Sequence, residues 1–131
     1  MYKFFTLLIC MLFCHIIDDY VLQAPCLCNL KQKSWWKEHA PDEMYKYDYI
    51  AALIAHAFSW AFMIQLPILI YMRFNVNWVY FTFFIINMIG HASVDHMKAN
   101  QRKINLIRDQ EYHLLQIFTT ALGFASWHIG F

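Results

Sequence analysis

The sequence predicts an all-α, polytopic membrane protein, a single-domain bundle of four transmembrane helices over residues 1–131. The first observation is composition. The 131 residues are 60% hydrophobic and 19% aromatic, and only 15% are charged, whereas a soluble domain is roughly 45–50% apolar. The second is the length of the apolar runs. Four segments, at about 2–23, 49–72, 78–98 and 109–131, are each near the roughly 20 residues that cross a bilayer as a helix.

The first segment, 2–23, also fits part of the pattern of a signal peptide, because it begins with Lys3 and an apolar stretch. No small-x-small cleavage site follows the stretch, and His15, Asp18 and Asp19 interrupt its end. We therefore expect a retained transmembrane helix.

The other three segments contain almost no glycine or proline. Pro67 in the second is the exception, and it favours a kink because proline cannot donate a backbone hydrogen bond. A buried core helix of a soluble protein is the alternative explanation for any one segment. Four such segments in succession favour the membrane instead.

The basic residues predict the orientation of the spans. Lys3 and Arg73 would lie on one side, and eight basic residues on the other, in the first and third loops: Lys31, Lys33, Lys37, Lys46, Lys98, Arg102, Lys103 and Arg108. The positive-inside rule then places residues 24–48 and 98–108 in the cytoplasm and both termini outside. A net charge of only +1, with acidic residues interspersed, argues against a nucleic-acid partner.

Polar and ionisable residues gather in the cytoplasmic halves of the four predicted helices. They are His15, Asp18, Asp19 and Gln23 in the first, His56 in the second, His91, Asp95 and Lys98 in the third, and Asp109, Gln110 and His113 in the fourth. Three His–Asp pairs within this set are spaced by four residues, so each pair shares a helix face, about 40° apart. This spacing predicts that the polar faces converge on one site.

An ionisable side chain inside a span costs about 2.5–3.5 kcal/mol, so such residues are usually interior-facing and functional. One interpretation is a structural Asp–His network that holds the helices together. The other is a metal site for one or two Zn²⁺, Mn²⁺ or Fe²⁺ ions, with the ligands His15, Asp19, His56, His91, Asp95, Asp109 and His113. Since these exceed the needs of one ion, either two ions share a carboxylate or some aspartates orient histidine ligands.

The motifs HIIDDYVLQ, Lys31, His56, HASVDHMK and DQEYH occur in that order over about residues 11–118. In them the sequence resembles the family of small bacterial and phage membrane proteins catalogued as domain of unknown function 3307. The segments LKQKSWW and KANQRKINL look most like the phage members. The resemblance implies a bacterial inner-membrane protein, and it favours Asp19 over Asp18, which lies outside the family's pattern. That pattern is similar to those of small membrane-bound metal-dependent hydrolases.

The leading functional hypothesis is metal-dependent hydrolysis at the inner leaflet of the membrane, on a membrane-associated or phosphate-bearing substrate. Asp19, Asp95 and Asp109 are the expected catalytic carboxylates, and Lys98 with Lys31 would hold an anionic group. We expect Gln23 and Gln110 to contact the substrate or the ligands. The alternative is a non-enzymatic membrane protein, either a small metal or proton-coupled carrier or a phage accessory protein that modifies the host membrane. The absence of an internal repeat in the sequence counts against transport.

Overall fold

The computed structural model describes residues 2–23 and 25–128, and every regular element in this part of the chain is helical. Four long helices dominate: α1 (Tyr2–Ile17), α4 (Asp48–Tyr71), α5 (Trp78–Ala99) and α6 (Leu106–His128). The shorter elements are a π-helical turn, η1 (Asp18–Leu22), two short helices, α2 (Pro25–Leu30) and α3 (Lys33–His39), and a 3₁₀ turn, η2 (Glu43–Tyr45). The prediction of an all-α fold is confirmed.

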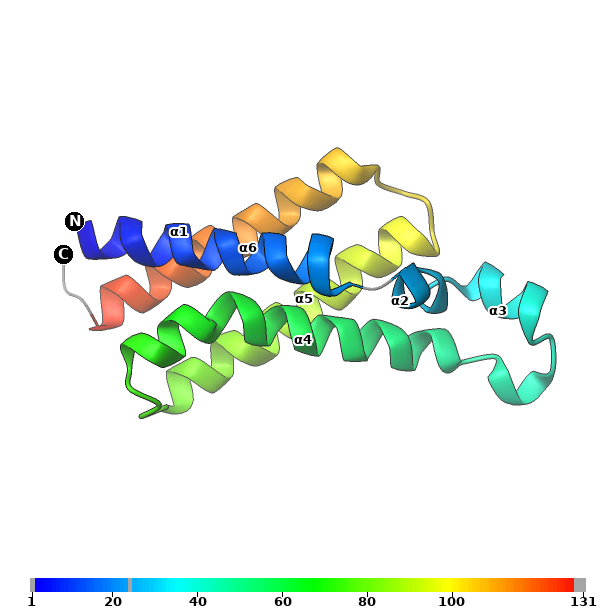
Figure 1. Cartoon of the computed structure of the whole chain (residues 1–131), viewed down its shortest axis with the longest axis horizontal. Helices are drawn as coiled ribbons and strands as arrows, with labels where there is room; N and C mark the ends of the chain where they lie inside the picture. The colour runs from blue at the N-terminus through cyan, green and yellow to red at the C-terminus, as the bar shows by residue number, and fades with distance from the viewer. Residues whose placement is uncertain (1, 24, 129–131) are drawn as a thin grey trace.

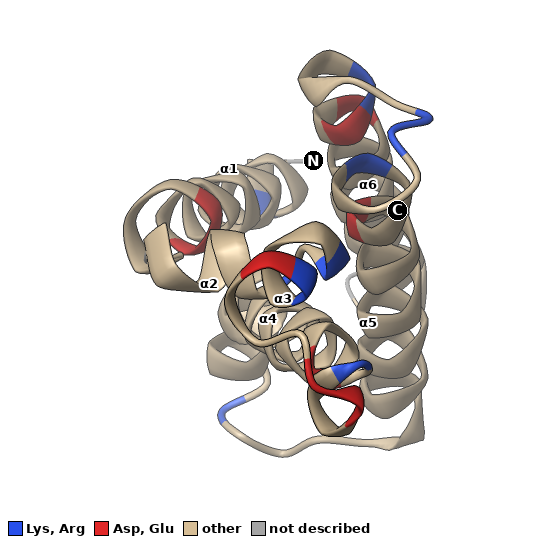
Figure 2. Cartoon of the chain, turned by 90° about the vertical axis from the view of Figure 1, so that its right-hand side faces the viewer, with Lys and Arg blue, Asp and Glu red and all other residues tan. Residues whose placement is uncertain are grey.

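The long helices alternate in direction along the long axis of the molecule, so that the two ends of the bundle differ in character (Figure 1). One end, which we call the charged end, comprises residues 18–48 and 95–111. The opposite end, the terminal end, contains the start of α1, the α4–α5 connection and the end of α6. Among all Lys, Arg, Asp and Glu residues, only Lys3 and Arg73 belong to the terminal end. Figure 2 looks onto the charged end and shows the acidic and basic positions gathered there.

The helix bounds differ from the expected ones in three places. The first helix changes from α to π geometry after Ile17. The fourth begins at Leu106 rather than at 109, where the side chain of Asn105 accepts a hydrogen bond from Arg108 N at 3.0 Å. The segment expected to be a plain loop, 24–48, contains α2 and α3. α4 continues through Pro67 as one helix, and the expected end of the last span, 129–131, lies outside the described residues.

The long helices form the bundle through four neighbouring pairs, with α4 against α1 and α5, and α6 against α1 and α5. Large apolar side chains fill the interior toward the terminal end, among them Met11, Ile64, Ile117 and Phe124. α5 and α6 approach closely at Gly123, where a Cβ atom would collide with the ring of Phe83. Small residues at a helix interface allow such an approach.

The exterior of all four long helices is strongly apolar. By length and composition, two segments, Tyr2–Leu22 and Glu43–Tyr71, could each cross a membrane. α5 and α6 do not meet the same hydropathy criterion, because they contain more polar residues. They nevertheless expose large apolar side chains, namely Phe81, Ile85, Ile86 and Ile89 on α5 and Leu114, Leu115 and Phe118 on α6.

Candidate metal centre

Histidines from all four long helices meet inside the bundle, near its charged end. His15 of α1, His56 of α4, His91 of α5 and His113 of α6 are each at most 3% exposed. The ring centroid of His91 lies 4.9 Å from that of His56 and 4.3 Å from that of His113, and the ring centroids of His15 and His113 are 5.8 Å apart. The faces that the four-residue spacing predicted to converge are therefore brought together.

Asp95 lies at the middle of this cluster and faces three of the histidines. Its Oδ2 atom is 3.6 Å from Nε2 of His56 and 3.8 Å from Nε2 of His91, and its Oδ1 atom is 3.8 Å from Nε2 of His113. Because the two oxygens face different histidines, this carboxylate has the placement of one that bridges two binding positions.

The two other predicted carboxylates flank Asp95. Asp19 Oδ1 is 3.5 Å from Nε2 of His56, and Asp109 Oδ1 is 3.5 Å from Nε2 of His113. All three carboxylates are therefore near imidazole nitrogens that are buried away from solvent.

The spacing of these atoms fits a metal ion. Two groups, Asp19–His56–His91 and His91–Asp95–His113, each bring three ligand atoms within 4.8 Å of one another, and they share His91. Zn²⁺ binds such ligands at about 2.0–2.2 Å, so neighbouring ligand atoms of a tetrahedral site lie roughly 3.3–3.6 Å apart. The carboxylate–imidazole distances of 3.5–3.8 Å require only a small contraction around an ion.

Several of these atoms have no hydrogen-bond partner among the described residues. They include both ring nitrogens of His91 and of His113, and one oxygen each of Asp19 and Asp109. A buried polar atom without a partner is costly, so native proteins rarely keep one without a reason. A divalent cation would satisfy nitrogen and oxygen lone pairs at once, whereas additional hydrogen bonds would need donors for each.

His15 differs from the other three histidines because both of its ring nitrogens are engaged. Trp60 Nε1 donates to His15 Nδ1 at 2.9 Å, which leaves the proton of a neutral ring on Nε2. That atom lies 3.2 Å from Oε1 of Gln110, which can accept it. His15 is therefore placed to orient α6 through Gln110 rather than to offer a free lone pair.

Asp18, which the motif pattern left aside, is buried beside His56. Its Oδ2 atom is 3.8 Å from His56 Nδ1, and its Oδ1 atom accepts a hydrogen bond from the Ser59 hydroxyl at 2.6 Å. A carboxylate on the far nitrogen of a histidine ligand fixes the orientation of the ring. The spacing of three residues between His15 and Asp18 was a signal that would have placed both on one face.

The π-helical turn η1 determines which of the following side chains faces inward. Gln23 N donates to Asp18 O at 2.9 Å, a bond that spans five residues. As a result Leu22, which α-helical spacing would turn inward beside His15, is 55% exposed. Gln23 faces inward instead, with its amide nitrogen 3.2 Å from His56 Nε2. Single π-helical turns of this kind are frequent at functional sites.

The two predicted lysines each contact a carboxylate of the cluster. Lys31 Nζ donates to Asp95 Oδ2 at 2.5 Å, and Lys98 Nζ donates to Asp109 Oδ2 at 2.6 Å. Lys31 is buried, whereas the side chain of Lys98 is 38% exposed. Gln110 also donates to Asp109 Oδ2, at 3.2 Å. The cluster therefore holds positive charge on the side that faces the charged end.

Trp60 belongs to the cluster and was not predicted from the sequence. Its ring stacks on His91 with centroids 4.2 Å apart, and it is fully buried. It lies four residues after His56 on α4, the same spacing that indicated the His–Asp pairs. The remaining three histidines lie elsewhere: His96 stacks on Tyr49, His39 stacks on Trp35, and His128 lies near the end of α6 with its Nε2 atom 3.2 Å from Nδ2 of Asn77.

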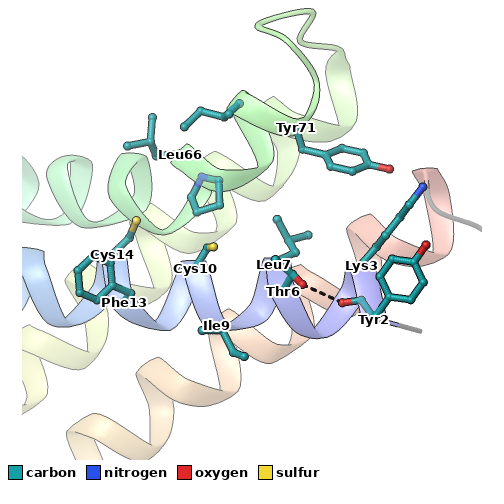
Figure 3. A pocket seen from close by; sticks show the side chains of 12 residues that line it. Tyr2, Lys3, Thr6, Leu7, Ile9, Cys10, Phe13, Cys14, Leu66 and Tyr71 are labelled. Atoms are coloured by element: carbon teal, nitrogen blue, oxygen red, sulfur yellow. Dashed lines mark hydrogen bonds between the residues drawn. The ribbon is translucent and has the colours of Figure 1, made fainter.

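A separate, apolar cavity of about 720 Å³ lies between α1 and α4, away from the cluster. Leu7, Phe13 and Leu66 line it together with the thiols of Cys10 and Cys14, and Lys3 lies at its terminal-end side (Figure 3). No group of metal-ligating side chains among the described residues includes any of its lining residues. The His–Asp cluster, rather than this cavity, is therefore the candidate functional site.

Comparisons of this chain with family models, with curated proteins and with solved structures gave no match. The resemblance drawn from the motifs consequently stays a prediction. The geometry of the cluster is the basis on which a function can be proposed.

Proposed function

We propose that all four long helices cross a bacterial inner membrane, with the charged end in the cytoplasm. The polarity of the molecule supports this proposal. Within residues 2–23 and 25–128, eleven polar or charged residues are buried in the interior, while 29 large hydrophobic side chains are exposed on the exterior. A soluble globule requires the reverse, since large exposed apolar surfaces attract membranes or partners. The excess of basic residues at the charged end supports the orientation.

We further propose that the protein is a metal-dependent hydrolase that acts at the inner leaflet on a phosphate-bearing substrate. The observation that carries this proposal is the pair of overlapping groups Asp19–His56–His91 and His91–Asp95–His113, buried together and rich in unpartnered ligand atoms. A divalent ion held there would activate a water molecule for attack on an ester. Asp109 belongs to neither group, and its unpartnered oxygen would accept the proton of that water.

Two alternatives remain, and the packing bears on one of them. A carrier would need a polar path from the cluster to the terminal end. Two amides next to the cluster are bonded to neighbouring helices: Nδ2 of the buried Asn87 donates to the Thr120 hydroxyl, and Nε2 of the half-buried Gln116 donates to Asn87 O. Farther out, Met11, Ile68 and Phe124 fill the interior. The other alternative is a structural Asp–His network without metal, and the experiment below distinguishes it from a metal site.

Elemental analysis of protein purified without chelator tests the proposal. We expect one or two equivalents of Zn²⁺, Mn²⁺ or Fe²⁺ in the wild type. Asp95→Asn keeps the shape of the side chain but removes the charge that holds the cation, so the metal and any phosphoesterase activity should be lost while the protein still folds. Asp42→Asn, on an exposed loop, is the matched control and should retain both.

The absence of bound metal would contradict the proposal. Wild-type protein that carries no metal above background and does not rebind Zn²⁺ or Mn²⁺ would overturn the proposal of a metal-dependent hydrolase. In that case Asp95→Asn should change only stability, by roughly the 1–2 kcal/mol of an interhelical hydrogen bond.

A further inference from the structure

A small polar cavity leads from the cluster to the outside of the bundle. Its volume is about 100 Å³, and its lining comes from η1, from Gln23 and Lys31 in the connections before and after α2, and from α5 and α6. The carboxylates Asp19, Asp95 and Asp109 line its buried side, and the exposed side chains of Tyr20 and Leu106 line its outer side. The outer border is therefore formed by η1 and the start of α6.

Both lysines of the cluster line this cavity. Lys31 and Lys98 each contact a carboxylate of the cluster, at 2.5 and 2.6 Å, and both present their ammonium groups beside the cavity. An anionic group that entered would meet two cations next to the proposed metal position, together with the amide of Gln110. This arrangement suits a phosphoryl group, which carries several acceptor oxygens.

The outer rim of the same cavity is apolar. Tyr20 of η1 and Leu106 at the start of α6 line it and are 60% and 55% exposed, and the residues that follow them, Val21 and Ile107, are 70% and 69% exposed. The first turns of α6 diverge from α1 at this end of the bundle (Figure 1). A water-soluble phosphate compound would gain nothing from contact with these apolar side chains, whereas a lipid acyl chain would bury apolar surface against them.

We propose that the substrate is an anionic phospholipid that reaches the cluster laterally from the inner leaflet, between η1 and the start of α6. This inference rests on the proposed function and specifies its substrate class. The phosphate lies at Lys31 and Lys98, and the acyl chains stay in the bilayer against Tyr20 and Leu106. In the reaction, the oxygen of water bonds to phosphorus and the P–O ester bond to the leaving alkoxide breaks. One proton of the water passes to an aspartate, and the aspartate returns that proton to the leaving alkoxide, which becomes the alcohol.

The test measures binding of phosphatidic acid to metal-loaded protein in phosphatidylcholine nanodiscs. We expect phosphatidic acid to be retained over phosphatidylcholine of identical chains, and glycerol 3-phosphate to compete only weakly. Lys98→Gln should weaken binding of phosphatidic acid about tenfold, through the loss of one charge-assisted contact. Leu106→Gln should weaken it as well, while leaving binding of glycerol 3-phosphate unchanged. Leu115→Gln, on the exposed apolar face of α6 away from the cavity, is the matched control.

Equal affinity for glycerol 3-phosphate and phosphatidic acid would overturn the proposal that the substrate is a lipid. Equal effects of Leu106→Gln and Leu115→Gln on the binding of phosphatidic acid would overturn it as well. Metal content measured on the same samples distinguishes the two proposals. Metal-loaded protein without a preference for phosphatidic acid contradicts only the lateral lipid route. Protein without metal contradicts the hydrolase itself.

Discussion

The four buried histidines have different partners, and this difference predicts different effects of replacing them. Both ring nitrogens of His15 are hydrogen bonded, whereas neither ring nitrogen of His91 has a hydrogen-bond partner among the described residues. A free lone pair is required of a metal ligand, and a bonded ring acts by orienting its neighbours. His91 is therefore the more direct ligand.

We predict that His91→Ala abolishes stoichiometric metal binding, while His15→Gln retains the metal with an affinity about 10–100-fold lower, as is typical of groups that orient ligands. Competition with a chelator of known affinity, in detergent, measures both. His96→Ala, on α5 but stacked on Tyr49 outside the cluster, should leave the affinity unchanged. Loss of metal as complete in His15→Gln as in His91→Ala would contradict the division of roles.

Much of the cluster could be predicted from single residues, because helical geometry is local. Spacing of four residues places His91 and Asp95 on one helix face. A shared site then requires only that the polar faces of the four helices meet. Trp60 was missed, and Asp18 was set aside in favour of Asp19, for a different reason. A buried tryptophan is typical of an ordinary core, and that both adjacent aspartates face His56 depends on the packing around Ser59 and His56.

Among the elements, the short helices α2 and α3 are the ones that the sequence did not predict. Their apolar residues are few and lack a long periodic pattern, so the helices depend on contacts made after folding. Asn100 at the end of α5 supplies two: its Nδ2 donates to Lys31 O at 3.0 Å, and its Oδ1 accepts from Lys33 N at 2.7 Å. One side chain thereby holds the α2–α3 junction and, with it, Lys31 over Asp95.

We predict that Asn100→Ala releases this junction while the four long helices stay assembled. Two lost hydrogen bonds of about 0.5–1.5 kcal/mol each should lower the free energy that docks α2 and α3 by roughly 1–3 kcal/mol. The measurement is the rate at which a thiol reagent labels Cys28, which is half-buried on α2, in protein whose other cysteines are replaced by alanine. The rate should rise in Asn100→Ala and not in Asn29→Ala, and an unchanged rate would show that Asn100 does not hold the junction.

The π-helical turn could not be predicted either, since its five-residue hydrogen bond leaves no mark in the composition. In an α-helix, Leu22 would fall on the inner face beside His15. After the turn, Leu22 is exposed and the adjacent Gln23 reaches His56, while Tyr20 of the turn lies at the outer border of the cavity.

For the whole molecule, the distribution of charge predicts the topology. Single cysteines at Ser34 and Gln101, on the charged end, should resist a membrane-impermeant thiol reagent in intact cells, and one at Asn75, in the α4–α5 connection, should react. All three positions are exposed in the structure, so burial does not explain a failure to label. Permeabilised cells provide the control, where all three should react. The reverse pattern in intact cells would invert the orientation.

The origin of the cluster in four separate helices has a consequence for biosynthesis. If the four helices cross the bilayer as proposed, each helix that enters it alone holds its ionisable groups without the partners that compensate them, at about 2.5–3.5 kcal/mol for each buried charge near the centre. α6, which carries Asp109 and His113, follows the other three long helices in the chain. The cluster is thus completed only after α6 has been synthesised, and an ion bound at His91 would mark an assembled bundle, distinct from one in which α6 has not yet docked.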